Sequence, residues 1–482
     1  MGVAQYLKSR VTELNPERPI KPTNPFKVLA TLNASQWNNF LLAFCCWTWD
    51  AVDFFVVSLT VTDVAKSLGK STTDITWGIT LVLMLRSVGA IITGLVADIY
   101  GRKYIMAFVL IMFSVLEIGL GFVHNMKEFL IVRALFGIAM GSMSGLAQVT
   151  ALESAPPKAR TLLGGLLQQG YSTGYLLATC FARGFVDTKL GWRGLAFFTS
   201  GPPILLVIWR LLTPETDAFL AMKAQRMQIP DEGGSKVRKF AREGKMALRN
   251  HGGIFTILVF IMIGFNFSSH ASQDLLPTYL KQQRSFDADW VTITMCMANL
   301  GAICGGFFFG WLAQFMGKRL TMMITFVLGA ALLPAYALST TKPGIVLSFF
   351  FEQFAVQGGW SVVPTLLLEL APPQYRTFVA GTAYQLGNLA SSASSTIEST
   401  VAQQYPLPGG KHNYGKVIGI LMGCVFSYLL VVIFLAPERA YSGLAASDAL
   451  QDGEDDLKAT TSNRSDVENK GTDDHIEYVT KR

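Results

Sequence analysis

The sequence is poor in charged residues. Asp, Glu, Lys and Arg make up 15% of its 482 residues, compared with roughly 25% in an ordinary soluble domain. Hydrophobic residues make up 51% of the chain, and the mean hydropathy is +0.37. A soluble protein of this length would expose far more charge. The composition therefore excludes a mostly disordered chain and predicts an integral membrane protein.

Several common kinds of site and signal are also missing. The six cysteines all lie in apolar stretches and none has metal-ligand spacing, which excludes a disulfide scaffold and predicts no bound metal or other cofactor. No nucleophile–base set or phosphate loop is recognisable, so we expect no enzyme activity. The net charge of +7 lies in loops between apolar runs, which indicates membrane topology and not nucleic-acid binding. The first 36 residues are polar and contain four prolines but no apolar leader, so the first span must direct insertion.

Twelve segments have the length and composition of membrane-spanning helices, which need about 20 mostly apolar residues. They lie near 37–62, 74–97, 103–122, 129–152, 160–182, 193–212, 253–279, 290–314, 319–338, 344–369, 376–401 and 416–436. Strands of a membrane barrel would be half as long and would alternate in polarity. We therefore predict an all-α membrane protein with twelve transmembrane helices.

The basic residues predict the orientation of these spans. The stretch 223–249 and the short loops at 102–103, 158–160 and 318–319 are rich in Lys and Arg. All fall on one side of a twelve-span arrangement, together with both termini, and the positive-inside rule makes that side cytosolic. The predicted divisions are a cytosolic tail at 1–36, six-helix bundles at 37–212 and 253–437, a cytosolic loop at 213–252 and a disordered acidic tail at 438–482.

The two halves repeat one another. The stretch 94–103, Gly-Leu-Val-Ala-Asp-Ile-Tyr-Gly-Arg-Lys, matches 310–319, and the stretch 153–161 matches 369–377. Both matches have an offset of 216 residues. Two unrelated motifs with one offset indicate an internal duplication. Parallel six-helix halves with a site between them are typical of secondary transporters that rock between two states.

The first of these loops resembles the signature of the major facilitator superfamily, G-x-x-x-D-x-x-G-R-K between spans two and three. Pro214-Glu215-Thr216 resembles the end of span six in that superfamily. The resemblance covers roughly residues 37–440, and the second loop departs from it at Gln314, where Asp is common. It implies the major facilitator fold. We interpret a group of charged residues at the cytosolic helix ends as a latch for the inner gate: Asp98, Arg102, Glu153 and Arg160.

Five ionisable side chains stand out within the spans, where each charge costs at least about 2.5–3.5 kcal/mol. Asp50 and Asp53 share one face of span one, Arg86 lies near the middle of span two, and His270 and Asp274 lie one turn apart in span seven. Two further carboxyls, Glu117 and Glu398, lie towards helix ends, where solvated positions are expected.

Span seven carries a single polar stripe. Asn266, His270, Gln273 and Asp274 occupy positions i, i+4, i+7 and i+8. Pro277 cannot donate a backbone hydrogen bond, so we expect a bend after the stripe. The outer half of this span is therefore predicted to form a gate and a binding surface.

The same stretch closely resembles the motif N-x-x-[S/T]-H-x-[S/T]-Q-D-x-x-x-T of the fungal Jen-type lactate/pyruvate–proton symporters, in the sialate–proton symporter branch of the superfamily. Every specified position between 266 and 278 is filled. The resemblance implies short carboxylate substrates, proton symport and a plasma-membrane location. It also implies functional roles for Asn266, His270, Gln273 and Asp274, and less directly for Arg86 and Gln385.

The chemistry of these residues predicts their roles. Arg86 can anchor a carboxylate, or it can pair with Asp50 or Asp53. His270 titrates near neutral pH and, with Asp274, is a candidate proton carrier; Asp50 and Asp53 are rival carriers. His270 and Asp274 could instead be a hydrogen-bonded pair that holds the outer gate. Amides of spans five and eleven, Gln169 and Gln385, either line the cavity or bond helix to helix.

We therefore predict a transporter that takes up lactate and pyruvate with protons, the proton being the only coupling ion. A dicarboxylate–proton symporter for malate or succinate stays open, as does a receptor that binds carboxylates without transport. The predicted partners are the substrate, protons and the lipid bilayer. Lysines in the acidic tail at 458, 470 and 481 could bring ubiquitin and arrestin-type endocytic machinery to the protein, although a plain solvated tail fits equally.

Overall fold

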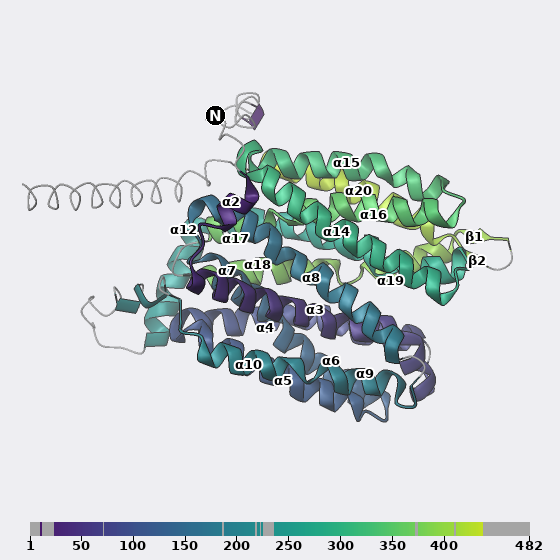
Figure 1. Cartoon of the computed structure of the whole chain (residues 1–482), viewed down its shortest axis with the longest axis horizontal. Coiled ribbons are helices and arrows are strands. Elements are labelled where there is room, and N and C mark those ends of the chain that lie inside the picture. Colours follow the sequence, from purple (N-terminus) through teal and green to yellow (C-terminus); the bar gives the residue numbers. More distant parts are fainter. Residues whose placement is uncertain are drawn as a thin grey trace, which may run out of the picture. The chain divides into compact units, whose positions relative to one another are not determined.

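The computed structural model describes residues 10–11, 24–70, 72–185, 188–216, 219–221, 223–224, 236–371, 375–408 and 411–436. It is helical except for one short hairpin within these ranges (Figure 1). The helices of the first half are α2 (Pro25–Leu29), α3 (Ala34–Leu68), α4 (Thr72–Tyr100), α5 (Arg102–Gly121), α6 (Met126–Gly141), α7 (Met143–Leu152), α8 (Pro157–Phe185), α9 (Gly191–Thr199) and α10 (Pro202–Leu212).

The second half repeats this order of long helices. It consists of α12 (Lys236–Gln273), α13 (Leu276–Thr278), the π-helix η1 (Tyr279–Gln283), α14 (Ala288–Met316), α15 (Lys318–Leu338), α16 (Lys342–Trp360), α17 (Val363–Leu370), α18 (Arg376–Ser391), α19 (Ser394–Gln403) and α20 (Tyr414–Leu435). The hairpin pairs β1 (Pro406–Leu407) with β2 (Lys411–His412), with Pro406 opposite His412.

Each of the twelve predicted spans coincides with one helix or with consecutive short helices. Within the described part of the chain, nine of these are long and apolar enough to cross a membrane. The other three are spans five (α8), ten (α16 and α17) and eleven (α18 and α19). Their polar side chains are buried inside the protein, among them Gln168, Glu352 and Gln385. These three spans therefore have a lower hydropathy than the other nine because they contribute polar side chains to the interior of the protein.

The two loops that carry the repeated motif turn in the same way. Gly101 and Gly317, which are 216 residues apart, both have positive φ, at 110° and 85°. Side chains other than glycine rarely adopt such values. After Gly101, the Glu215 carboxylate accepts hydrogen bonds from the backbone N–H groups of Arg102 and Lys103, at 2.9 and 3.0 Å, and so caps α5.

Several spans are interrupted near their middle. Span seven breaks after Gln273, four residues before Pro277, as predicted, and continues through α13 and η1. Span four breaks at Ser142, between α6 and α7. Such breaks free backbone polar groups, which membrane transporters tolerate only where they are buried in protein or line a cavity.

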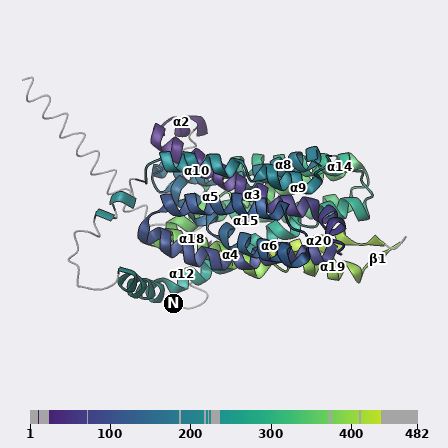
Figure 2. The ribbon, with the colours of Figure 1, turned by 90° about the horizontal axis from the view of Figure 1, so that it is seen from below.

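The most extensive contacts between the halves are those of α4 with α18 and of α8 with α14 (Figures 1 and 2). Glycine permits the close approach in the second pair. A Cβ on Gly165 of α8 would lie 3.0 Å from the Cα of Gly310 in α14. Since each pair joins the first half to the second, movement of the halves must occur along these contacts.

The described part of the chain lies within one compact unit, Met1–Ala436. The predicted central loop 213–252 differs from the structure, because α12 already begins at Lys236 and runs without a break into span seven. Most of the predicted N-terminal tail and all of the acidic tail 438–482, including its three lysines, lie outside the described residues. Those predictions stay open.

Candidate functional site

A small pocket lies between the two halves. It is lined from the first half by Phe55, Arg86, Gln168 and Tyr171, and from the second by Asn266, Ser269, His270, Gln273, Asp274, Trp360, Tyr384 and Asn388. Its free volume of about 10 Å³ accommodates roughly one water molecule. A ligand of several heavy atoms therefore requires the lining helices to separate, and this conformation is closed around the site.

Span seven supplies most of the polar lining of the second half. The Nδ1 atom of His270 lies 3.1 Å from the Asp274 carboxylate, and its Nε2 atom lies 3.1 Å from Oδ1 of Asn388 in α18. Asn266 donates to the carbonyls of Met262 and Tyr384, at 2.8 and 3.3 Å. The predicted polar stripe is therefore one continuous surface, and α18 holds its histidine from the other side.

Gln273 also belongs to this surface. Its Nε2 atom donates to Oε1 of Gln353 in α16 at 2.9 Å. One turn further along α16, Gln357 donates to the hydroxyl of Ser269 at 3.4 Å. These two amides of span ten were not predicted, because a glutamine in a span gives no sign of the direction in which it points.

Arg86 faces the pocket from the first half. It is 2% exposed, its guanidinium lies 4.8 Å from the centre of the Phe54 ring, and its Nη2 atom lies 3.9 Å from Asp50. That separation is too long for a hydrogen bond, and neither Asp50 oxygen has a hydrogen-bond partner in the structure. Of the two predicted pairings, the structure has Asp50 as the ion-pair partner. The pair is loose enough for an anion to compete with it.

Asp53 lies near Asp50 and also faces a second set of buried charges. It lies within electrostatic reach of Glu117 in α5 and Arg133 in α6. All three side chains are fully buried, and their charged atoms have no hydrogen-bond partners. Glu117 was expected in a solvated position, which is wrong because α5 turns it towards Arg133. Glu398 is likewise buried, and the expectation of a solvated side chain is wrong there too.

The two predicted repeat-related amides lie outside the pocket lining. Gln169 packs against the backbone of Gly306 in the contact of α8 with α14, while its neighbour Gln168 lines the pocket. Gln385 is fully buried behind Asn388. It accepts a hydrogen bond from Asn388 at 2.7 Å and donates one to Ser144 of α7 at 3.0 Å.

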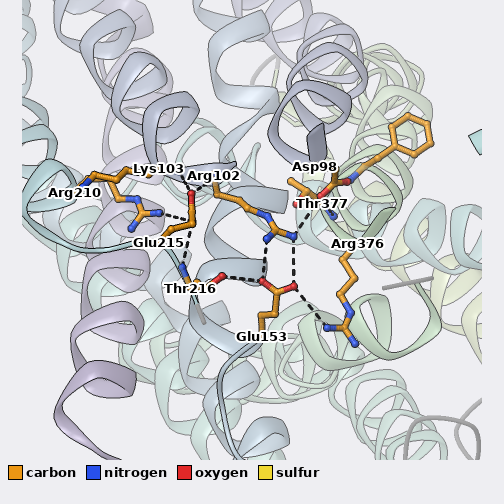
Figure 3. Close-up of polar contacts among 10 residues, drawn as sticks. Asp98, Arg102, Lys103, Glu153, Arg210, Glu215, Thr216, Arg376 and Thr377 are labelled. Carbon is orange, nitrogen blue, oxygen red and sulfur yellow. Dashed lines mark hydrogen bonds and ion pairs between the residues drawn. The ribbon is translucent and has the colours of Figure 1, made fainter. Parts of the chain in front are cut away.

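A second group of charged residues joins the halves at the end of the bundle that carries the basic loops, which we call the basic end (Figure 3). Asp98 accepts hydrogen bonds from the backbone N–H groups of Phe378 and Thr377, at 2.9 and 3.4 Å, and so caps α18. Arg102 bridges Asp98 at 3.5 Å and Glu153 at 3.2 Å.

Arg376 of α18 completes this group. Its Nη1 atom lies 3.7 Å from Glu153, which also accepts a hydrogen bond from the Thr216 hydroxyl at 3.1 Å. The basic end is therefore closed by contacts that run from α4 and α7 to α18. We call Asp98, Arg102, Glu153 and Arg376 the latch. The predicted latch residue Arg160 instead donates to the carbonyl of Ala155 at 3.2 Å.

The second copy of the loop differs from the first at this position. Gln314, at the position equivalent to Asp98, has an amide nitrogen without a hydrogen-bond partner. Lys318 still pairs with Glu369, but both residues belong to the second half. At the position of Asp98, the second copy therefore carries a neutral amide in place of the carboxylate that caps α18.

Aromatic residues complete the pocket, and none of them was predicted from the sequence. Tyr384 packs edge-to-face against Trp47 and tilted against Trp360, with ring centres 5.9 and 5.4 Å apart.

Among the described residues, no group of three or more His, Cys, Asp or Glu side chains is arranged to hold a metal ion.

Two six-helix halves around a closed, charged pocket define a multi-pass membrane transporter of the major facilitator fold. Residues 27–449 match the family described as sugar (and other) transporter, and the chain belongs to this family. The family consists of transporters and not of enzymes.

Individual relatives give the same assignment. The chain is 38% identical to the carboxylic acid transporter protein homolog of Saccharomyces cerevisiae, over 88% of this chain and 71% of that protein. It is 26% identical to the cis,cis-muconate transport protein of Acinetobacter baylyi (74% and 86%) and 24% identical to the sialic acid transporter NanX of Escherichia coli (85% and 96%). The resemblance to Jen-type permeases in span seven is thus confirmed at the level of family.

Solved structures agree on the fold. The proton:xylose symporter XylE superposes with a TM-score of 0.68 at 18% identity, covering 83% of this chain and 95% of that one. The human organic anion transporter MFSD10 gives 0.60 at 15% identity, covering 83% and 99%.

Proposed function

We propose that the protein imports short monocarboxylates such as lactate and pyruvate together with protons. The observation that carries this proposal is the placement of Arg86 on the same small pocket as His270 and the amides of span seven. A carboxylate in a dry cavity needs a cation and hydrogen-bond donors. The filled motif at 266–278 and the name of the yeast relative support the same substrate class.

Arg86 is the proposed anchor for the substrate. Its loose ion pair with Asp50 means that an incoming carboxylate can take the place of that aspartate. The guanidinium can then offer two parallel N–H donors to the two oxygens. The amides of Gln168, Asn266 and Gln273 are positioned to bind the rest of a small ligand once the pocket widens.

The proposed proton carrier is the His270–Asp274 pair. A histidine changes charge near neutral pH, and its contact with Asp274 lets the pair hold one additional proton beside the substrate site. Proton and anion would bind from outside as a net neutral pair and leave on the inside. We propose that the basic end faces the cytosol, by the positive-inside rule, and that the protein lies in the plasma membrane.

Asp50 and Asp53 are the rival carriers. Both are fully buried, and no hydrogen bond satisfies their carboxylate oxygens. Substitution separates the two assignments. If His270→Ala abolishes proton-driven accumulation while Asp53→Asn preserves it, the histidine pair carries the proton. If His270→Ala keeps proton-driven accumulation intact, the assignment to histidine is wrong.

A dicarboxylate substrate is the second candidate, and two observations favour it. The relative from Acinetobacter baylyi is named for cis,cis-muconate, and Gln168 adds an amide from the first half to the pocket. Uptake of labelled lactate in yeast without endogenous carboxylate carriers distinguishes the two. We expect competition by unlabelled pyruvate and not by succinate. Proton-driven succinate uptake without lactate uptake would assign the protein to dicarboxylates.

A further inference from the structure

A directed chain of hydrogen bonds leads from His270 to the opposite half of the protein. The His270 Nε2 atom lies 3.1 Å from Oδ1 of Asn388. Asn388 donates through Nδ2 to Oε1 of Gln385 at 2.7 Å, and Gln385 donates through Nε2 to the hydroxyl of Ser144 at 3.0 Å. All four side chains are buried. His270, Asn388 and Gln385 belong to the second half, whereas Ser144 belongs to α7 of the first.

The polarity of this chain depends on how many protons the His270–Asp274 pair holds. An amide accepts through oxygen and donates through nitrogen. In the structure both ring nitrogens of His270 face oxygen atoms, Oδ1 of Asn388 and the Asp274 carboxylate. Only two states fit: imidazolium beside a carboxylate, or an Nε2–H imidazole beside a protonated Asp274. Each holds one proton more than neutral histidine beside ionised aspartate.

We propose that Asn388, Gln385 and Ser144 form a relay that transmits the proton load of the His270–Asp274 pair to the contact between the two halves. The relay rests on the proposed function, because it requires that this pair exchanges a proton during transport. It assigns positioning roles to Asn388 and Ser144, and it makes the orientation of the Gln385 amide part of the coupling.

Release of one proton to water reverses the chain. The remaining proton lies between Nδ1 of His270 and the Asp274 carboxylate. The Nε2 atom of His270 then becomes a hydrogen-bond acceptor, and Asn388 must turn its NH₂ group towards it. The Asn388 oxygen then faces Gln385, which must turn in the same way. The Gln385 oxygen finally faces Ser144, so that its hydroxyl donates instead of accepting. No covalent bond other than the released N–H or O–H is broken.

The two helices at the end of the relay pack so closely that a reversed hydrogen bond at Ser144 should affect their contact. A Cβ on Gly145, next to Ser144, would lie 2.8 Å from the carbonyl oxygen of Thr377 and 3.2 Å from Cα of Gly381. The helices α7 and α18 therefore touch backbone to backbone at this point. The same two helices lead from the relay to the latch, because α18 begins at Arg376 and Glu153 follows the end of α7.

Other charged groups face the proton-carrying pair. Arg86 of α4 and Asp274 of span seven both interact electrostatically with His270. Glu398 of α19 and two tyrosines of α8 interact with Asp274. Three other ionisable groups lie on helices that pack against α12. Glu352 of α16 interacts electrostatically with Tyr279, Tyr428 of α20 donates to the carbonyl of Phe260, and Tyr384 of α18 lines the pocket.

The test measures how uptake depends on pH. Labelled lactate uptake is compared at acidic and neutral pH for the wild type, Ser144→Ala, Ser144→Thr and Ser142→Ala. Ser142 is the matched control, because it is a buried hydroxyl two residues away that has no hydrogen-bond partner. Loss of one hydrogen bond should lower the acid-to-neutral ratio of Ser144→Ala about three- to tenfold. Its KM at acidic pH should stay within about twofold, and Ser144→Thr and Ser142→Ala should keep the wild-type ratio.

The outcomes distinguish failure of the relay from failure of proton-coupled uptake. A wild type whose uptake ignores protons would overturn proton coupling and the relay together. A proton-driven wild type with an unchanged ratio in Ser144→Ala would overturn the relay alone. If Ser144→Ala does not reach the membrane, Gln385→Met gives the second reading, because its thioether has a similar length but cannot donate to Ser144 at any pH. The ratio should then fall as well, and a wild-type ratio in this variant would contradict the relay.

Discussion

Replacing Asp98 with asparagine is expected to open the basic end of the protein. Asp98 is 2% exposed, accepts two backbone hydrogen bonds at the start of α18 and pairs with Arg102 at 3.5 Å. Asparagine keeps an acceptor oxygen but removes the charge. A charged acceptor contributes about 1 kcal/mol more than a neutral one, and the lost contacts to the helix dipole and to Arg102 add about another 1 kcal/mol. The sum of about 2 kcal/mol corresponds to roughly a 30-fold shift towards the open state.

Hydrogen exchange, followed by mass spectrometry on the purified protein, measures this shift towards the open state. The peptide that begins at Arg376 contains the amides of Thr377 and Phe378, which Asp98 holds in the closed state. Their exchange should accelerate by up to about 30-fold in Asp98→Asn. Gln314→Asn is the matched control at the repeat-equivalent position, where the amide nitrogen has no partner, and should change nothing. Equal exchange in both variants would refute the latch.

Three further results are expected. Arg86→Lys should raise the KM for lactate about tenfold, because lysine cannot offer a planar fork of two donors; an unchanged KM in uptake assays would argue against the anchor. Gly305→Ala should lower the melting temperature in detergent, since its Cβ would collide with the carbonyl of Phe354, whereas Gly184→Ala, with nothing nearby, should not. Deleting 445–482 should slow turnover at the cell surface if the tail recruits endocytic machinery, and turnover at the wild-type rate would remove that role.

The fold could be predicted because its causes are local. A helix that crosses a bilayer needs a run of apolar residues of fixed length, and the 216-residue offset makes the duplication visible without any structure. Even the weakest spans could be placed, although α8 and α18 bury polar faces. The start of α12 was misplaced because the basic stretch before span seven was taken for a loop, although charged residues form helices readily.

Only part of the site could be predicted from the sequence, because many of its contacts join residues that are far apart in the chain. Arg86 and His270 stand out because a charge within a membrane is costly. Glu117 gave no such signal, since its place near a helix end suggested water, and only the packing of α5 against α6 brings it to Arg133. The contact of His270 with Asn388 spans 118 residues of sequence, and no local pattern reports it. Aromatic lining residues such as Trp360 look the same in sequence as those that face lipid.

Proton flux driven by substrate is the property to measure most directly. The purified protein is reconstituted into liposomes that contain a pH-sensitive dye, and lactate is added outside at constant external pH. We expect lumenal acidification faster than in liposomes with Arg86→Gln, which report the background entry of undissociated acid. The excess should match the labelled lactate taken up. Labelled uptake through the wild type without any excess acidification would contradict proton-coupled carboxylate transport.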